Sequence, residues 1–286
     1  MKKVIPLAIL ALILIPAYVV AAKSDTVSAT KPSIVLVHGA WADGSSWSRV
    51  IALLQDKGYT VYTPANPLRG LASDSAYIAD FLHSITGPIV LVGHSYGGAV
   101  ITNAAAGNPN VKALVFVDAF APDQGETLGQ LSSVPPPPGL SPSCLAGDPT
   151  LVFNFVALTS GDVDTYVKPS LCPSCFANDL ASSQGAVLAS IQRPFALSSL
   201  NQKSGVPAWK TIPSWYLVGT IDQAIPSWAQ LFMAQRAGST IVQVRASHLS
   251  MISHAPAVSD LIQQAATTVT GNSDTSPQLA LAPTSL

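Results

Sequence analysis

Short apolar stretches alternate with amphipathic ones along two parts of this chain. The apolar stretches are rich in valine, isoleucine and leucine, which predicts strands buried on both faces of a sheet. These expected strands are residues 33–40, 59–66, 88–95, 111–120, 213–220 and 240–247. The amphipathic stretches repeat at helical spacing, at residues 45–58, 73–85, 97–107, 226–238 and 255–269. Strands that alternate with helices predict an α/β fold with a mostly parallel sheet and helices on both faces.

The alternation stops over residues 122–208. This stretch is rich in proline, serine and glycine and shows only weak helical patterns, at residues 151–158 and 184–191. A long irregular stretch inside an α/β domain typically serves the active site. We therefore expect a cap or lid insertion at 122–208, between a first part of the core at 32–121 and a second part at 209–270.

The two ends of the chain differ from this core. Residues 1–22 begin with Lys2 and Lys3, continue as an apolar run and end in small residues, as a secretory signal peptide does. An uncleaved anchor is the alternative, because the run approaches a membrane-spanning length. We expect a secreted or periplasmic protein with no stable membrane association after cleavage. Residues 23–31 then form a spacer, and residues 271–286 a flexible polar tail.

Export makes the cysteines interpretable. The chain has 3 cysteines, Cys144, Cys172 and Cys175, and all of them lie in the expected cap. An oxidising compartment permits a disulfide. The sequence predicts one structural disulfide, from Cys144 to either Cys172 or Cys175, and leaves one thiol over.

Charge and motifs exclude several classes of function. The net charge is −1, only 10% of residues are charged and no basic block is present, so we expect no nucleic-acid partner. The chain has no phosphate-binding glycine loop, zinc-protease helix or calcium loop, so we expect neither a metal nor a cofactor.

The candidate chemistry begins with Gly93-His94-Ser95-Tyr96-Gly97. A serine between an expected buried strand and an expected helix must turn sharply, which strains its backbone. Gly93 and Gly97 then leave room for the turning chain. Strand, turn and helix in this order are the context of a nucleophile elbow, and the sequence predicts Ser95 as the nucleophile.

A serine nucleophile needs a base, and the base needs an acid that orients it. His248 follows the last expected strand directly, where open α/β sheets bind their ligands, and we favour it over His254. Asp222 follows the strand at 213–220, and we favour it over Asp118 at the end of 111–120. The order nucleophile, acid, base belongs to one of the known triad arrangements.

Two backbone N–H groups are needed to bind the oxyanion that forms during acyl transfer. Tyr96 follows the nucleophile and supplies one. The loop after the first strand supplies the other, and Ala40 is the candidate. Substitution at Ala40 should therefore act through geometry.

Four stretches together resemble the α/β-hydrolase family. They are VLVHGAWADGSSW, LVGHSYGGAV, GTIDQAIP and ASHLSMISHAP, and they leave only the middle region unmatched. The resemblance is strongest to the small subfamily of plant methylesterases, hydroxynitrile lyases and bacterial serine esterases. It implies a six-stranded sheet and a cap over Ser95.

The leading hypothesis is a secreted serine hydrolase that cleaves small, hydrophobic carboxylic esters through an acyl-enzyme. Candidate substrate-binding residues are Trp41, Tyr96, Phe153 and Phe155. A hydroxynitrile lyase is one alternative, although such enzymes carry a threonine where this chain has Gly39. A ligand-binding receptor with low turnover is the other.

Overall fold

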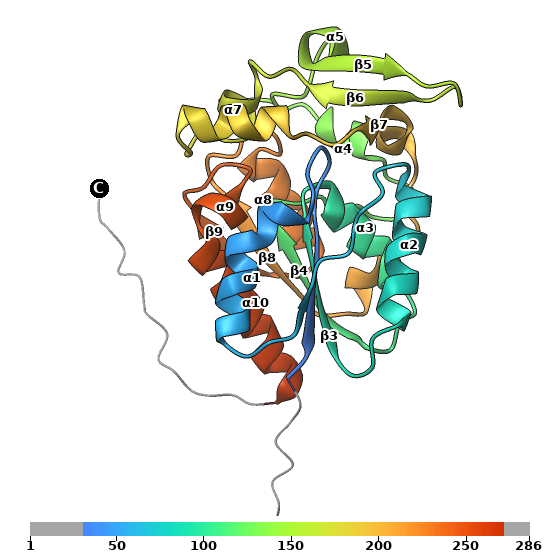
Figure 1. Cartoon of the computed structure of the whole chain (residues 1–286), viewed down its shortest axis with the longest axis vertical. Helices are drawn as coiled ribbons and strands as arrows, with labels where there is room; N and C mark the ends of the chain where they lie inside the picture. Colours follow the sequence, from blue (N-terminus) through green and yellow to red (C-terminus); the bar gives the residue numbers. More distant parts are fainter. Residues whose placement is uncertain (1–30, 272–286) are drawn as a thin grey trace, which may run out of the picture.

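The computed structural model describes residues 31–271 and places a parallel sheet at its centre (Figure 1). Within this range the sheet has six strands in the order β2-β1-β3-β4-β8-β9, and every neighbouring pair is parallel. The strands are β1 (Ser33–Val37), β2 (Val61–Tyr62), β3 (Ile89–His94), β4 (Val111–Val117), β8 (Ser214–Gly219) and β9 (Thr240–Val244). The expected α/β fold and its six-stranded sheet are confirmed.

Helices cover both faces of this sheet. One face carries η1 (Gly44–Trp47), α1 (Ser48–Asp56) and α10 (Ala255–Thr270), and the other carries α2 (Leu71–His83), α3 (Tyr96–Ala104) and α8 (Ser227–Arg236). Side chains alternate along each strand, so that Val35 and Leu91 pack toward α2 and α3 while Leu36 and Val90 pack toward α1 and α10. This explains the continuous apolar runs, because both faces of every central strand are buried.

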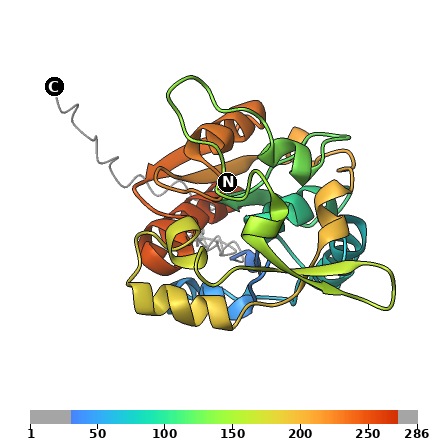
Figure 2. The same cartoon turned by 90° about the horizontal axis from the view of Figure 1, so that it is seen from above.

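A second layer lies above the carboxyl ends of the strands (Figure 1) and covers them when seen from above (Figure 2). It contains a three-stranded antiparallel sheet in the order β5-β6-β7. The short helix η3 (Ala208–Lys210) packs beside α3 in the core. The elements of the second layer are α4 (Leu128–Ser132), α5 (Pro149–Val152), β5 (Phe153–Ala157), β6 (Val163–Val167), α6 (Cys172–Cys175), α7 (Ser182–Ser190), β7 (Phe195–Ala196) and η2 (Leu197–Asn201). We call this layer the cap.

The expected helix at residues 151–158 is wrong, because β5 occupies residues 153–157. Aromatic and β-branched side chains alternate there, and β5 pairs with β6 as a hairpin whose turn contains Gly161 at φ 89°. The hydrogen bonds and side-chain contacts between β5 and β6 thus override the weak helical pattern of residues 151–158. The other weak pattern is confirmed as α7.

The start of α2 also differs from the expectation. The helix begins at Leu71, after Gly70, and not at Ser73. Asp74 therefore lies inside the first turn, where its carboxylate accepts the backbone N–H of Arg69 at 3.0 Å. Acidic side chains in a first helical turn are favoured by the free N–H groups and the helix dipole.

The disulfide joins Cys144 to Cys175, and Cys172 is a buried free thiol. The bond connects α6 to the loop before α5, where the Cys144 N–H donates to the Gln223 carbonyl at 2.8 Å. Cap and core are also joined by the Arg69–Asp164 ion pair at 2.7 Å.

The expected signal peptide at 1–22, most of the spacer at 23–31 and the tail at 272–286 lie outside the described residues. Among residues 31–271, none of the helices combines the length and the apolar character needed to cross a bilayer.

Removing the disulfide should destabilise the protein. The two cysteines are separated by 31 positions in the sequence. Replacing Cys144 and Cys175 by serine should therefore lower the free energy of unfolding by about 3–4 kcal/mol, because the unfolded chain gains entropy. Urea unfolding followed by circular dichroism measures this loss. Cys172→Ala is the control, and an equal loss in that variant would contradict the assignment.

Candidate active site

Ser95 lies at the sharp turn between β3 and α3. Its backbone has φ 52° and ψ −123°, a conformation that residues with a side chain rarely adopt. A Cβ atom at Gly93 would lie 2.5 Å from the carbonyl oxygen of Gly97, and one at Gly97 would collide with the carbonyl oxygen of Val37. The two glycines therefore permit the turn, which holds a buried Ser95 hydroxyl at the carboxyl edge of the sheet.

A chain of hydrogen bonds joins Ser95 to residues from two other strand ends. Ser95 Oγ lies 2.9 Å from Nε2 of His248, and Nδ1 of His248 lies 2.7 Å from Oδ2 of Asp222. Asp222 follows β8 and His248 follows β9, so the parallel strands bring all three to one edge. In this geometry the imidazole can take the serine proton while the carboxylate fixes its orientation.

The Asp222 carboxylate is enclosed by donors. It accepts the backbone N–H groups of Ala224 at 2.7 Å and Ile225 at 3.0 Å, and the side-chain amide of Gln230 at 2.7 Å. Burial raises the pKa of Asp222, and these three donors oppose that rise by stabilising the charged form. The donors also fix the carboxylate in the orientation that His248 requires.

Asp118, the alternative acid, makes no hydrogen bond with His248. One of its oxygens accepts the backbone N–H of Ser250 at 3.3 Å, and the other has no partner among the described residues. Burial and the neighbouring Asp222 raise the pKa of Asp118 well above its ordinary value. Two carboxylates enclosed together cannot both ionise cheaply, and Asp222 has more hydrogen-bond donors, so burial favours the neutral form at Asp118.

His248 is a buried, neutral base. Burial lowers its pKa below the ordinary value, because the charged ring would lose its hydration. The ring packs against the edge of Phe176, with centroids 5.3 Å apart, and against His94 at 4.8 Å. His94 Nε2 also lies 2.8 Å from the carbonyl oxygen of His248 and donates to it.

The N–H groups of Ala40 and Tyr96 have no acceptor among the described residues. Tyr96 is the first residue of α3, where the helix dipole favours negative charge. The loop that carries Ala40 is fixed by His38, whose Nδ1 donates to the Gly39 carbonyl at 2.9 Å while its Nε2 accepts the N–H of Asn66 at 3.0 Å. Both donors are therefore free and held in place beside Ser95.

A cavity of about 170 Å³ opens onto Ser95 and His248 between core and cap. Trp41, Tyr96 and Phe153 line it together with Ala40, as the sequence predicts. The structure places Phe155 outside this cavity, with 40% of its side chain exposed. Residues two apart in a strand face the same side, so the difference comes from their positions along β5. Phe153 begins the strand directly after α5 and lines the cavity, whereas Phe155 lies two residues further along, beyond it.

Trp41 connects the cavity to the cap. Its indole N–H donates to the carbonyl oxygen of Thr165 at 3.0 Å, and its own carbonyl accepts the N–H of Arg193 at 3.1 Å. Its ring stacks on Phe153 at 5.5 Å, and its backbone has φ 57°. An uncommon backbone conformation at a bulky residue is retained only where surrounding contacts determine it, and here the cap provides those contacts.

Two of the histidines lie away from Ser95. His254 Nδ1 is 3.5 Å from Asp179, whose carboxylate also accepts the N–H of Ser247 at 3.0 Å. His83 is exposed on α2, with Nδ1 donating to the Ala79 carbonyl at 2.7 Å. Both positions agree with the preference for His248.

Sequence reasoning missed several positioning residues. Gln230 donates to the Asp222 carboxylate, and His94 donates to the backbone carbonyl of His248. The Tyr96 hydroxyl donates to the Asp74 carboxylate at 2.8 Å. Nothing in the local pattern marks them, since each acts on a residue from another element. His94 is adjacent to Ser95 in the sequence, which places it near the site, but adjacency does not show that its ring contacts the backbone of His248.

Comparison with known proteins places this geometry in a family. The model of the Alpha/beta hydrolase family matches residues 34–261. A carbendazim hydrolyzing esterase of Nocardioides sp. (strain SG-4G) is 34% identical over 128 residues, which cover 40% of this chain and 53% of that protein. A pyrethroid hydrolase of Sphingobium wenxiniae is 32% identical over 112 residues, 34% of this chain and 39% of that protein. The matched segments thus span about half, or less, of these two relatives.

Solved structures share the fold. An extracellular alpha/beta-hydrolase from a Paenibacillus species, described as a structural and functional homologue of tobacco salicylic acid binding protein 2, superposes with a TM-score of 0.68. It is 24% identical, and the alignment covers 82% of this chain and 99% of that one. At this identity the likeness supports the architecture alone.

The two buried carboxyl groups should respond differently to amidation. Asp222→Asn should lower ester turnover by about 10⁴-fold, because the amide favours the wrong imidazole tautomer. Asp118→Asn should retain turnover within about tenfold, because an amide resembles the neutral carboxyl group that burial favours there. Initial rates on a short p-nitrophenyl ester measure both. Equal losses in the two variants would contradict the separation of roles.

The pH profile should report the buried base. Activity requires neutral His248, so kcat/KM should stay constant as the pH falls through the ordinary histidine pKa of about 6.5 and decline only below it. Rates from about pH 4 to 9, with circular dichroism at each pH as the control for folding, test this. An acid limb centred at or above the ordinary value would show that burial does not control the base.

Proposed function

The chain belongs to the alpha/beta hydrolase family, and we propose that it is a serine esterase that cleaves small, apolar carboxylic esters through an acyl-enzyme. The observation that carries this proposal is the hydrogen-bonded chain Ser95–His248–Asp222, which opens onto an apolar cavity. The names of the two curated relatives, an esterase and a pyrethroid hydrolase, support ester hydrolysis as the reaction class.

In the acylation step, Ser95 Oγ attacks the carbonyl carbon while Nε2 of His248 accepts the hydroxyl proton. The new oxyanion accepts the N–H groups of Ala40 and Tyr96, each of which contributes roughly 10²–10³-fold to turnover in enzymes of this kind. Asp222 stabilises the imidazolium through Nδ1–H. Collapse of the tetrahedral intermediate breaks the ester C–O bond, and His248 Nε2 returns the proton to the departing alcohol.

In the deacylation step the same groups act on water. His248, again neutral, takes a proton from a water molecule that attacks the acyl carbon. The oxyanion returns to the same two N–H groups. Collapse then breaks the bond from the acyl carbon to Ser95 Oγ and releases the carboxylic acid, while His248 Nε2 gives its proton back to Ser95 Oγ. The lowered pKa keeps His248 neutral and ready to accept a proton at neutral pH. Burial also disfavours the imidazolium, and the hydrogen bond from Nδ1–H to Asp222 opposes this by stabilising the charged ring.

The cap supports the apolar part of the proposal. The Trp41, Phe153 and Phe195 rings surround the cavity, with Trp41 and Phe195 centroids 5.3 Å apart. Apolar walls favour apolar groups on either side of the ester bond, and they exclude competing water from the acyl-enzyme.

The lyase alternative is disfavoured by the oxyanion loop. A Cβ atom at Gly39 would lie 2.7 Å from the Cβ of Ser95, so this site has no room for the threonine that the lyase pattern requires. Hydroxynitrile lyases of this fold also use a lysine in the cap near the base. Lys210 is paired with Asp123 at 2.6 Å and does not line the cavity, so it does not supply that lysine. Cyanide release from a cyanohydrin remains the discriminating assay.

We propose further that the protein works outside the cytoplasm, either secreted or periplasmic. The support is the signal-like composition of residues 1–22, and a disulfide within the cap suits an oxidising compartment. With a net charge of −1 the chain offers no electrostatic basis for binding nucleic acid.

Replacing the nucleophile tests the mechanism. Ser95→Ala should lower kcat for p-nitrophenyl acetate by on the order of 10⁶-fold, since the hydroxyl that forms the acyl bond is gone. The unchanged protein should show a burst of p-nitrophenol equal to one acyl group per chain, with an acetyl adduct on Ser95 by mass spectrometry. Equal melting temperatures of the two proteins are the control. Undiminished turnover in the variant would overturn the proposal, and a folded protein that cleaves no ester would favour the receptor.

A further inference from the structure

The cavity above Ser95 is small. Its volume is about 170 Å³, and a dry cavity of about 150 Å³ is known to hold one benzene ring. An ester with one group larger than a ring must therefore extend into a neighbouring space. Two cavities adjoin the catalytic one and are candidates for this larger group.

The first neighbour is larger and apolar. It has a volume of about 400 Å³ and lies between α8 and the proline-rich loop at residues 134–138. We call it the proline-loop pocket. Four residues line both this pocket and the catalytic cavity, namely Phe120, Ser132, Ala224 and Ile225. The two spaces are therefore adjacent. Their common lining includes Ala224 and Ile225, whose N–H groups bind the Asp222 carboxylate.

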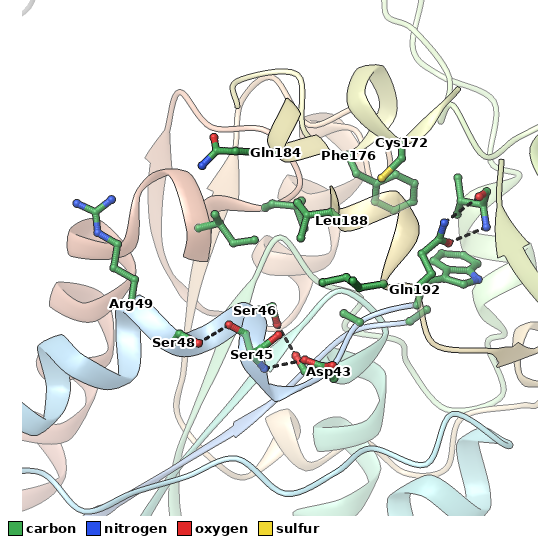
Figure 3. A pocket seen from close by; sticks show the side chains of 17 residues that line it. Asp43, Ser45, Ser46, Ser48, Arg49, Cys172, Phe176, Gln184, Leu188 and Gln192 are labelled. Carbon is green, nitrogen blue, oxygen red and sulfur yellow. Dashed lines mark hydrogen bonds between the residues drawn. The ribbon is translucent and has the colours of Figure 1, made fainter. Parts of the chain in front are cut away.

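The second neighbour carries more polar side chains than the proline-loop pocket, although apolar side chains also line it. It has a volume of about 330 Å³, lies between α1 and α7, and shares only Ala40 and Trp41 with the catalytic cavity. We call it the α1 pocket. Figure 3 shows Asp43, Ser45, Ser46, Ser48 and Arg49 along its core side, with Gln184 and Gln192 on the cap side. An apolar group placed there would remove these side chains from water without replacing their hydrogen bonds.

The charges around the proline-loop pocket also favour a neutral occupant. Glu126 is the one ionisable group that lines it among the described residues, and its carboxylate is paired with Arg236 at 2.6 Å. Val134 and Phe232, which also line the pocket, are 47% and 54% exposed. Covering such apolar surface is favourable in proportion to its area.

We propose that the catalytic cavity and the proline-loop pocket form one two-part site for neutral esters with a ring-sized group on one side and a larger apolar group on the other. The larger group, a long alkyl chain or a fused or multiple ring system, occupies the proline-loop pocket beyond Phe120 and Ile225. This assignment rests on the proposed esterase function and names the substrate class of that site.

Filling the pocket tests the assignment. Ala229 lies on α8, is partly exposed, and lines the proline-loop pocket without reaching the catalytic cavity. Ala229→Trp should occupy the space that the larger group needs. Gln184→Trp is the matched control, because Gln184 lies on α7 and lines only the α1 pocket. Both are single changes to tryptophan at helix surfaces, and melting temperatures check the fold.

The readout is the ratio of kcat/KM for p-nitrophenyl octanoate to that for p-nitrophenyl acetate. In the unchanged protein, kcat/KM should rise by up to about fourfold for each methylene group of the acyl chain that becomes buried. The ratio for octanoate over acetate should therefore be well above one. Ala229→Trp should lower the ratio at least tenfold, and Gln184→Trp should leave it within twofold. A ratio unaffected by Ala229→Trp, or lowered by Gln184→Trp instead, overturns the proposal.

A second measurement needs no substitution. A p-nitrophenyl alkylphosphonate that carries a diazirine at the end of an octyl chain should form a bond from Ser95 Oγ to phosphorus and expel p-nitrophenolate. Light then attaches the chain end to whatever it touches. Attachment within residues 131–137 or 226–233 supports the proline-loop pocket, and attachment within residues 182–192 overturns it. Absence of any label on folded protein would instead contradict the esterase function itself.

Discussion

The turn at Ser95 is the constraint on which the rest of the structure depends. The chain must leave a fully buried strand and begin a helix within one residue, and it does so with φ 52° at a residue that has a side chain. Such a conformation persists only when close packing determines it. That packing is the approach of α3 to β1 and β3, which the missing Cβ atoms of Gly93 and Gly97 allow. The same approach directs the free N–H groups of the first turn of α3 toward the serine.

Enclosing ionisable groups around this turn is what gives the site its reactivity. Asp222 and Asp118 lie within one buried region, and the protein resolves the conflict by giving the N–H donors to Asp222 and almost none to Asp118. Burial keeps His248 neutral. His94 donates a hydrogen bond to the backbone carbonyl of His248 and leaves both ring nitrogens of His248 available for Ser95 and Asp222. Charge is therefore concentrated on one carboxylate, which is where an imidazolium needs it.

Two contacts between the cap and the core reach the catalytic residues and their immediate neighbours. Trp41 follows Ala40, the candidate oxyanion donor, and its indole N–H donates to the Thr165 carbonyl in the cap. A shift of the cap would therefore also move the loop that carries Ala40. Phe176 follows Cys175 directly, and its ring packs on His248. The disulfide therefore helps to hold the Phe176 ring where it shields the imidazole from water. The cap thus supplies part of the cavity wall above Ser95, whereas the core holds the Ser95–His248–Asp222 chain.

The sequence by itself determined the succession of strands and helices along the chain and singled out the candidate reacting groups, which the structure brings together. Buried strands of a parallel sheet are apolar on both faces, and the elbow needs glycines at fixed positions, so both leave a local pattern. The sequence could not determine that residues 153–157 pair as a strand, which of Cys172 and Cys175 binds Cys144, or that Phe155 lies outside the cavity. Nor could it reveal Gln230, His94 and Asp74 as partners of the site. Each of these depends on a neighbour distant in the chain, and only the tertiary packing of cap on core supplies that neighbour.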